Sequence, residues 1–266
     1  MPTALTDAAA AASAPFLPAR EPAAAPIPTA NPLAALPALV RDLPESGHRL
    51  KLAPLPETAD SLALSQLALS ARASRRTLAI VCADALAASR LAAEIAWFAP
   101  SASISVFPDW ETLPYDHFSP HQDLVSERLA ALYRITRGEC DVVLVAAQTA
   151  LYRLAPQSFL AAHTFFLTQG EKLDVEALRA QLALAGYTHV TQVVSPGEFS
   201  IRGGLIDLYP MGAALPYRLD LFGDEIETIK TFDADTQRTL YPMRDVRLLP
   251  AREFPIDEGG RTSRIG

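Results

Sequence analysis

The stretch GEFSIRGGLIDLYPMGAALPYRLDLFGDEIETIKTF, residues 197–232, decides the fold of the second half of the chain. Its apolar residues recur in short runs with β-like spacing, and Gly203-Gly204 and Gly223-Asp224 interrupt the runs where a bulge or turn is expected. Because side chains alternate between the two faces of a strand, one side of this small sheet should be apolar and the other charged. The charges expected on that second side are Arg202, Arg218, Asp220 and Asp224. A sheet that buries one face and displays the other can serve as a docking surface.

The residues around this stretch predict a small α+β domain. HTFFLTQGEKL (163–173) has the pattern of a strand and turn, and VEALRAQLALAGY (175–187) that of a helix ended by Gly186. Strands that mix with one or two helices, without regular alternation, are typical of this class. From about Val246 we expect the chain to return towards the first half of the molecule.

The residues before Pro156 alternate between strand-like and helical patterns. Such alternation predicts a parallel sheet with covering helices. The expected order is helix 62–73, strand 77–84, helix 85–100, strand 103–110, helix 124–138, and a buried strand that enters another helix within 141–154.

Composition limits the class of protein. The chain has 266 residues, 50% of them hydrophobic, and a formal net charge of −7. This is enough for one large or two small folded domains, and no apolar run is long enough to cross a membrane. The acidic balance argues against a surface built mainly to neutralise phosphates. Cys82 and Cys140 lie in apolar runs, as expected for buried thiols in a reducing cytoplasm.

Residues 1–45 are dominated by Ala and Pro. They contain no basic start followed by an uninterrupted apolar stretch, so we expect no secretory signal. Recurrent prolines prevent a long helix, and we therefore predict a disordered leader.

The segment DHFSPHQD (116–123) is the most metal-like part of the sequence, with Asp116, His117, His121 and Asp123. Zinc requires three or four converging ligands, and no Cys is near. Ser119-Pro120 is more typical of a helix start, with Ser119 as N-cap and Pro120 in the first helical position. We therefore expect no metal site here.

Two stretches carry a resemblance to a known family. GEFSIRGGLIDLYP with YRLDLFGDEIETIKTFD is similar to a segment shared by the repair protein UvrB and the transcription-repair coupling factors (Mfd). DWETLPYDHFSPHQDLVSERLAALYRI (109–135) is closer to the coupling factors. The similarity extends from about Leu78 to Pro255, and the chain resembles an N-terminal, UvrB-like fragment of these factors.

This resemblance implies a fold and an organisation. The fold class is α/β: a RecA-like parallel sheet with helices on both faces, degenerate and without a P-loop, into which a small α+β UvrA-binding domain is inserted. The expected parts are a leader (1–45), the first part of the RecA-like domain (46–160), the inserted UvrA-interaction domain (161–245), and a truncated return to the RecA-like domain (246–266).

The resemblance also implies a partner and a site. UvrA would bind the inserted domain at Arg202, Arg218 and Phe222, which match the arginine, arginine and aromatic positions of the family. The planar guanidinium suits bidentate pairing with carboxylates, and an aromatic side chain can act as an anchor between arginines. The alternative is two ordinary sheet arginines paired with Asp207, Asp220 or Asp224, and a core Phe. If the three residues form the site, Arg218→Ala should weaken UvrA binding and leave the fold intact. Phe222→Ala would cost stability only if Phe222 is a core residue.

A RecA-like domain normally binds ATP through GxxxxGK[ST]. The corresponding stretch here, LAPLPETADSLALSQLALSARASRRTLAIV, has no glycine and no GK pair. Lys51 and the arginines at 72, 75 and 76 lack the loop that would make them phosphate ligands. We therefore expect no cofactor and no ATP hydrolysis in this chain. ATP and magnesium belong to the motor of the longer family proteins.

Binding of DNA by this chain is also unexpected. Trp110, Tyr115 and Phe118 have acidic neighbours, whereas single-strand platforms pair aromatics with basic residues. The passage from Tyr115-Asp116 to the helix at Leu124 leaves no room for the DNA-gripping hairpin of UvrB. The resemblance thus implies a cytoplasmic module that recruits UvrA, while RNA polymerase and duplex DNA are contacted elsewhere in the longer protein. The alternatives are a UvrB-like ATPase or helicase half and a DNA-binding repair module.

Overall fold

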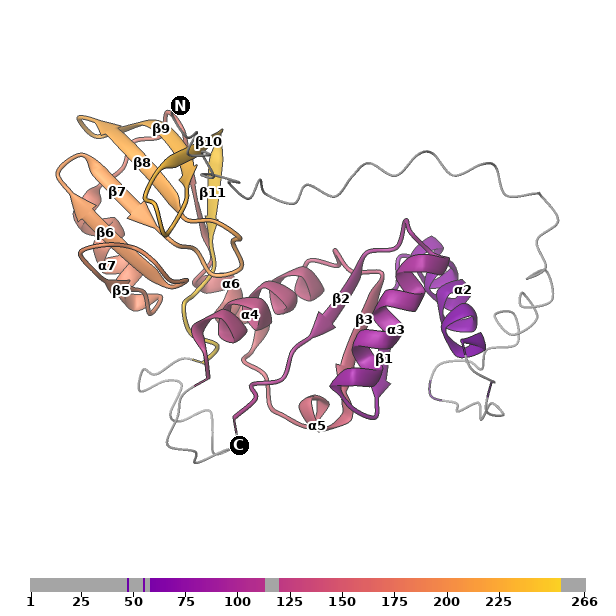
Figure 1. Cartoon of the computed structure of the whole chain (residues 1–266). Helices are drawn as coiled ribbons and strands as arrows, with labels where there is room; N and C mark the ends of the chain where they lie inside the picture. Colours follow the sequence, from indigo (N-terminus) through magenta and orange to yellow (C-terminus); the bar gives the residue numbers. More distant parts are fainter. Residues whose placement is uncertain (1–46, 48–54, 56–57, 113–119, 255–266) are drawn as a thin grey trace, which may run out of the picture.

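The computed structural model describes residues 47, 55, 58–112 and 120–254, and Figure 1 shows two units side by side. The first unit contains a three-stranded parallel sheet in the order β1-β3-β2. The strands are β1 (Leu78–Cys82), β2 (Ile104–Phe107) and β3 (Val142–Ala146). The helices of this unit are α2 (Ala59–Ala73), α3 (Ala85–Phe98), α4 (Gln122–Thr136) and α5 (Ala147–Ala150).

Helices α2 and α3 cover one face of the parallel sheet. Helix α3 begins where the side chain of Asp84 accepts a hydrogen bond from the Ala87 amide at 2.7 Å, a standard N-cap. Its apolar stripe, with Leu91 and Ile95, packs on the sheet. The core cluster on this face consists of Ala68, Cys82, Ala88, Leu91, Ile95, Val142 and Leu144.

The other face of the sheet is covered unevenly. Phe107, Val145 and Val81 share this face because they are partners across the three strands. Phe107 lies under Arg128 of α4 and is buried, whereas Val81 on β1 is exposed. Helices therefore lie on both faces as predicted, but α4 covers the second face only beside β2.

The second unit is built around a six-stranded sheet in the order β10-β9-β8-β7-β6-β5. All neighbours are antiparallel except β5 and β6, and a separate antiparallel pair joins β4 to β11. The strands are β4 (Phe165–Thr168), β5 (Thr188–His189), β6 (Glu198–Arg202), β7 (Leu205–Leu208), β8 (Tyr217–Phe222), β9 (Glu225–Phe232), β10 (Thr239–Met243) and β11 (Asp245–Leu248). Helices α6 (Gln157–Ala162) and α7 (Val175–Leu184) accompany them.

Helix α4 joins the two units. Arg128 points to the first sheet, while Leu129 belongs to the hydrophobic core of the second unit, together with residues of α7, β6, β7 and β8. Gly212 lies against α4, where a Cβ atom would come within 2.9 Å of the Ala130 Cβ. The Gly212 amide donates to the Ser126 hydroxyl at 2.7 Å. The close approach explains the need for glycine at this position.

Three details differ from the sequence expectations. Helix α4 begins at Gln122 with His121 as its N-cap, so Pro120 precedes the cap and is not in the first turn. Strand β11 pairs with β4 and not with the first sheet, so the expected boundary at residue 246 falls inside a strand. The chain approaches the first unit only after Leu248, where Glu253 pairs with Arg128. The predicted leader lies outside the described residues.

Candidate functional site

Three of the four charged residues predicted for one side of the sheet, Arg202, Arg218 and Asp220, share a face. In the antiparallel register, Asp207 is opposite Arg218, which is opposite Lys230. Two residues further along β8, and so on the same face, Asp220 is opposite Leu205 of β7, which is in turn opposite Arg202 of β6. The opposite face carries the apolar core that packs on α7 and α4. Asp224 lies in the β8–β9 turn, where Lys172 binds it at 2.9 Å and lowers its pKa.

A buried carboxylate lies at the centre of this face. Asp207 is 1% exposed and accepts three hydrogen bonds from arginine side chains. Arg218 donates from Nε to Oδ1 at 2.7 Å and from Nη2 to Oδ2 at 3.0 Å. Arg202 donates from Nη2 to the same Oδ2 at 2.6 Å. Asp207 thus brings together two of the three residues predicted for the site.

Arg218 is the more enclosed of the two arginines, with 16% of its side chain exposed. Its remaining contacts are a hydrogen bond from Nη1 to the Gln237 carbonyl at 3.1 Å and stacking over the Phe232 ring at 4.6 Å. The hydrogen bonds with Asp207 raise the pKa of Arg218 above its ordinary value. This arginine is therefore held on both sides.

Arg202 is half exposed, with 51% of its side chain accessible. Within the part of the chain that the structure describes, the only hydrogen-bond partner of its side chain is Asp207. A guanidinium has five N–H donors, so Arg202 presents most of its donors to solvent. The guanidinium of Arg202 is thus held by one hydrogen bond, and its other N–H groups can bind a partner.

Phe222 is at the end of β8, directly before Gly223, whose positive φ of 66° forms the β8–β9 turn. It is 79% exposed, so the alternative of a core Phe is wrong. An irregular register after Asp220 and the tight turn together place the ring at the tip of the hairpin. An aromatic side chain this exposed loses contact with water only when a partner covers it.

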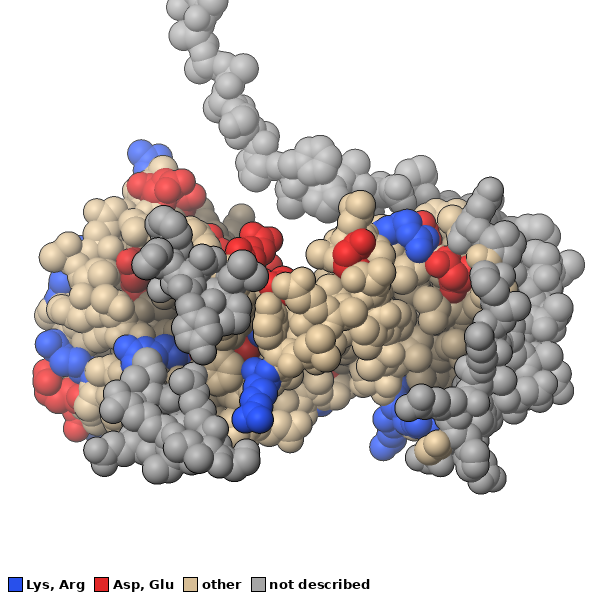
Figure 2. Space-filling model, turned by 90° about the horizontal axis from the view of Figure 1, so that it is seen from below, with Lys and Arg blue, Asp and Glu red and all other residues tan. Residues whose placement is uncertain are grey.

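The other charges of the face are paired. Asp220 accepts hydrogen bonds from Thr228 at 2.8 Å and from Lys230 at 3.2 Å. In the view of Figure 2, basic and acidic side chains are interspersed and do not gather into a patch of one sign. The paired alternative proposed for the arginines is thus confirmed for Asp207, but Arg202 still offers free donors beside the exposed Phe222.

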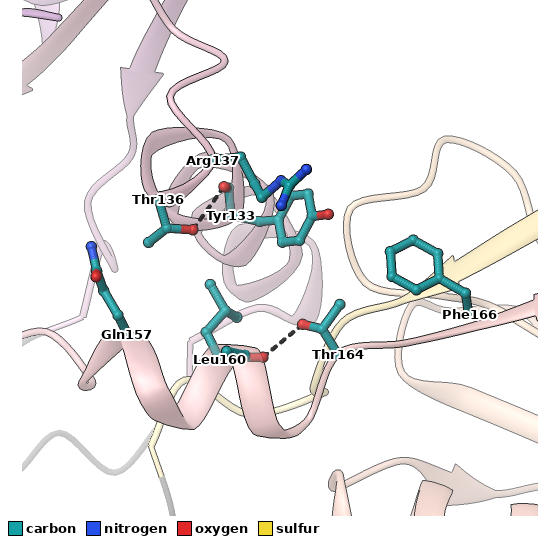
Figure 3. Close-up of a pocket in the computed structure, with 8 residues that line it drawn as sticks. Tyr133, Thr136, Arg137, Gln157, Leu160, Thr164 and Phe166 are labelled. Atoms are coloured by element: carbon teal, nitrogen blue, oxygen red, sulfur yellow. Dashed lines mark hydrogen bonds between the residues drawn. The ribbon is translucent and has the colours of Figure 1, made fainter. Parts of the chain in front are cut away.

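A pocket of about 440 Å³ lies between the C-terminal end of α4, helix α6 and strand β4 (Figure 3). In its wall, the Thr136 hydroxyl donates to the Tyr133 carbonyl of α4, and the hydroxyl of Thr164, which follows α6, donates to the Leu160 carbonyl of that helix. Tyr133, Arg137 and Gln157 provide the other polar side chains. The described lining holds no pair of groups suited to nucleophilic or acid–base catalysis.

The position expected for nucleotide binding is the start of α2. Its first turn contains Asp60, whose carboxylate accepts from Arg90 of α3 at 3.1 Å. Arg72 lies at the opposite end of α2 and donates to the Ser101 carbonyl. An acid in the first turn of a helix disfavours a phosphate at the N-terminus of that helix. Lys51 lies outside the described residues, and the absence of ATP binding stays a prediction.

Of the metal-like cluster, Asp116 and His117 lie outside the described residues. His121 contacts Asp123, 3.1 Å from Nδ1 to the carboxylate. Over residues 58–112 and 120–254, His, Cys, Asp and Glu side chains do not gather in groups of three that could hold a metal ion. In the same ranges, the structure contains no helix with the length and apolar character needed to cross a bilayer.

Trp110 packs onto neighbouring elements, as expected for a loop residue. It stacks with Tyr152 at 6.3 Å, meets Phe254 edge-on at 5.7 Å, and donates from Nε1 to Glu253 at 3.1 Å. Tyr115 and Phe118 are not among the described residues. The part of this aromatic cluster that can be examined is therefore structural.

Comparison with known proteins gives the second unit a family. Residues 165–254 match the model of the "UvrB interaction domain", and this range includes the whole charged face. The chain carries a UvrB interaction domain. It is also similar to proteins named transcription-repair-coupling factor: 43% identical over 202 residues to that of Haemophilus influenzae, and 47% identical over 179 residues to that of Escherichia coli.

These alignments cover 76% and 67% of this chain but only 17% and 16% of the two relatives. The relative from Bacillus subtilis is 30% identical over 154 residues. The chain thus spans about one sixth of the length of these two curated relatives. The matches identify it as a UvrB-like module of the coupling-factor family.

One important residue of the face was not singled out from sequence. Asp207 was only one of three candidate partners for the arginines. The available signal was strand alternation, because Leu205 and Asp207 lie on the same side of β7. Alternation alone does not predict the register between β7 and β8, and it is this register that places Asp207 opposite Arg218.

Proposed function

We propose that the UvrB interaction domain of this chain binds UvrA through Arg202, Arg218 and Phe222. The observation that carries the proposal is the 79% exposed Phe222 at the tip of the hairpin whose strand also contains Arg218, inside the segment that matches the family model. An exposed ring next to forked cations has the composition of an interface hot spot. The free donors of Arg202 favour an acceptor with carboxylate or carbonyl oxygens.

The name of these relatives supports a wider role. Proteins called transcription-repair-coupling factors connect transcription to repair, and this module would recruit UvrA to stalled RNA polymerase. Contacts with RNA polymerase and duplex DNA, and the ATP- and magnesium-dependent translocase motor, would then belong to other parts of a longer protein. A cytoplasmic location follows from that role.

The rival proposal is a UvrB-like ATPase half or a DNA-binding repair module. Asp60 in the first turn of α2 disfavours a nucleotide at that helix, and the formal net charge of −7 disfavours a surface built to neutralise phosphates.

The test is a calorimetric titration of the chain with purified bacterial UvrA. The parent chain should bind, and Phe222→Ala should lose at least about 2 kcal/mol of binding free energy, the threshold of a hot spot. Tyr241→Ala is the matched control, because Tyr241 is also an exposed aromatic, on the edge strand β10 of the same sheet. If the parent does not bind UvrA, or both variants bind like it, this function or this site is wrong.

A further inference from the structure

The carboxylate of Asp207 is inaccessible to any partner. It is 1% exposed, and both of its oxygens accept arginine hydrogen bonds. Arg218 uses the Nε–Nη2 edge of its guanidinium for this carboxylate, and Arg202 uses one Nη atom. The carboxylate therefore acts on the surface only through the two arginines.

Two guanidinium groups that converge on one point repel each other unless an anion lies between them. Asp207 supplies that anion, fixes the plane of the Arg218 guanidinium through two hydrogen bonds, and holds Arg202 through one. Arginine side chains have many rotamers, and ordering them on binding costs free energy. A pair that is already ordered in the free protein avoids this cost.

We propose that Asp207 is a positioning residue for the partner-binding face: it holds Arg202 and Arg218 in the free chain in the orientation in which they meet the partner. The inference rests on the proposed function, because it describes how that same face works. Its chemical consequence is that the partner should present carboxylate or carbonyl acceptors at a fixed spacing to the open donors of Arg202, next to an apolar recess for Phe222.

The test compares two carboxylates of the same face. Asp207→Asn keeps the side-chain shape but removes the charge and one acceptor. Asp220→Asn is the matched control, since Asp220 is on the same face but binds Thr228 and Lys230 and no arginine. In titrations with purified UvrA, well below the melting temperature of each variant, Asp207→Asn should weaken binding by about tenfold or more and Asp220→Asn by less than about threefold.

A double-mutant cycle separates positioning from a general loss of stability. If Asp207 acts through Arg202, then Asp207→Asn should cost less affinity in an Arg202→Ala background than in the parent, with a coupling of about threefold or more. A purely structural role would lower the melting temperature but leave the two affinity losses multiplicative. Multiplicative losses would therefore overturn the inference.

A measurement on the parent chain keeps the test independent of how well the variant folds. In the free chain, ¹⁵N NMR of the guanidinium groups should show separate Nη signals for Arg218 and Arg202, as expected for hindered rotation. The exposed arginine Arg179 on α7 should show averaged signals. Averaged signals for both face arginines, or unchanged UvrA affinity of Asp207→Asn, would refute the positioning role while leaving UvrA binding intact. A parent chain that does not bind UvrA would refute the proposed function itself.

Discussion

Arg128 of α4 and Glu253, 125 residues later in the chain, form a buried, bidentate ion pair. Nε and Nη2 of Arg128 each donate to one oxygen of Glu253 at 2.8 Å, and the two side chains are 0% and 4% exposed. The guanidinium also lies over the rings of Phe107 and Trp110, at 4.4 and 5.0 Å from their centroids. The pair holds the segment that follows the six-stranded sheet against the first unit.

Removal of one member of this pair should destabilise the chain strongly. Glu253→Ala leaves a buried guanidinium without its anion, and breaking such a pair typically costs about 3–5 kcal/mol. Glu139→Ala, which removes a solvent-exposed partner 3.8 Å from Arg137, should cost about 0–1 kcal/mol. Urea denaturation followed by circular dichroism measures both. Equal midpoints for the two variants would mean that the buried pair is not important for stability.

The two face arginines should differ in their effect on stability. Arg218→Ala should cost about 2–3 kcal/mol, below the ~3–5 kcal/mol of a fully broken buried pair, because Arg202 still neutralises Asp207. This revises the sequence-based expectation that Arg218→Ala leaves the fold intact. Arg202→Ala should cost about 1 kcal/mol or less, since its side chain is half exposed. The same denaturation series checks the order, and a larger loss for Arg202 than for Arg218 would contradict it.

Phe222→Ala should be nearly neutral for stability, because the 79% exposed ring is not part of the core. Substitutions at exposed positions usually stay within about ±0.5 kcal/mol. Phe199→Ala provides the contrast, because Phe199 is buried in the core of the same sheet and should cost about 3–5 kcal/mol. Thermal melting by circular dichroism distinguishes them. A large drop in melting temperature for Phe222→Ala would show that its ring is covered in solution.

Tyr187 should give the chain a distinctive alkaline response. Burial raises the pKa of its phenol well above the ordinary value, and its hydroxyl donates to the Leu249 carbonyl at 2.7 Å and accepts from the Met211 amide at 3.3 Å. Below a pH of about 10, both folded and unfolded states keep the proton, so stability does not depend on this group. Above it, only the unfolded state loses the proton, and stability falls as the pH rises.

Tyr187→Phe tests this response. At neutral pH the variant should be less stable by about 1–3 kcal/mol, because two buried backbone groups lose their partner. Between pH 9 and 11, as measured by urea denaturation, its stability should fall less steeply than that of the parent. Tyr241→Phe, at an exposed hydroxyl, should match the parent within about 0.5 kcal/mol at neutral pH. Parallel pH curves for parent and Tyr187→Phe would contradict the assignment.

The nucleotide prediction is that the chain does not bind ATP. Asp60 in the first turn of α2 repels phosphate, and Arg90 is already engaged by Asp60 and Glu94. Calorimetric titration with magnesium-ATP should give no binding at micromolar concentrations, and Asp60→Asn should not create it. A micromolar dissociation constant for the parent would revive the ATPase proposal.

The sequence alone determined the order of strands and helices, because apolar periodicity and turn residues are local signals. It also placed the two arginines on one charged face, since the two-residue alternation of a strand fixes sides without knowledge of its neighbours. The resemblance of residues 197–232 gave the family and the three candidate residues.

Only the tertiary structure decided which charges meet and which side chains are covered. Asp207 binds both arginines because the register of β6, β7 and β8 aligns them, and register depends on pairing between separate segments. Phe222 is exposed because it is the last residue of β8, directly before the turn at Gly223. Glu253 reaches Arg128 only because α4 packs between both units. Contacts between distant segments depend on the global packing, and local sequence patterns do not encode that packing directly.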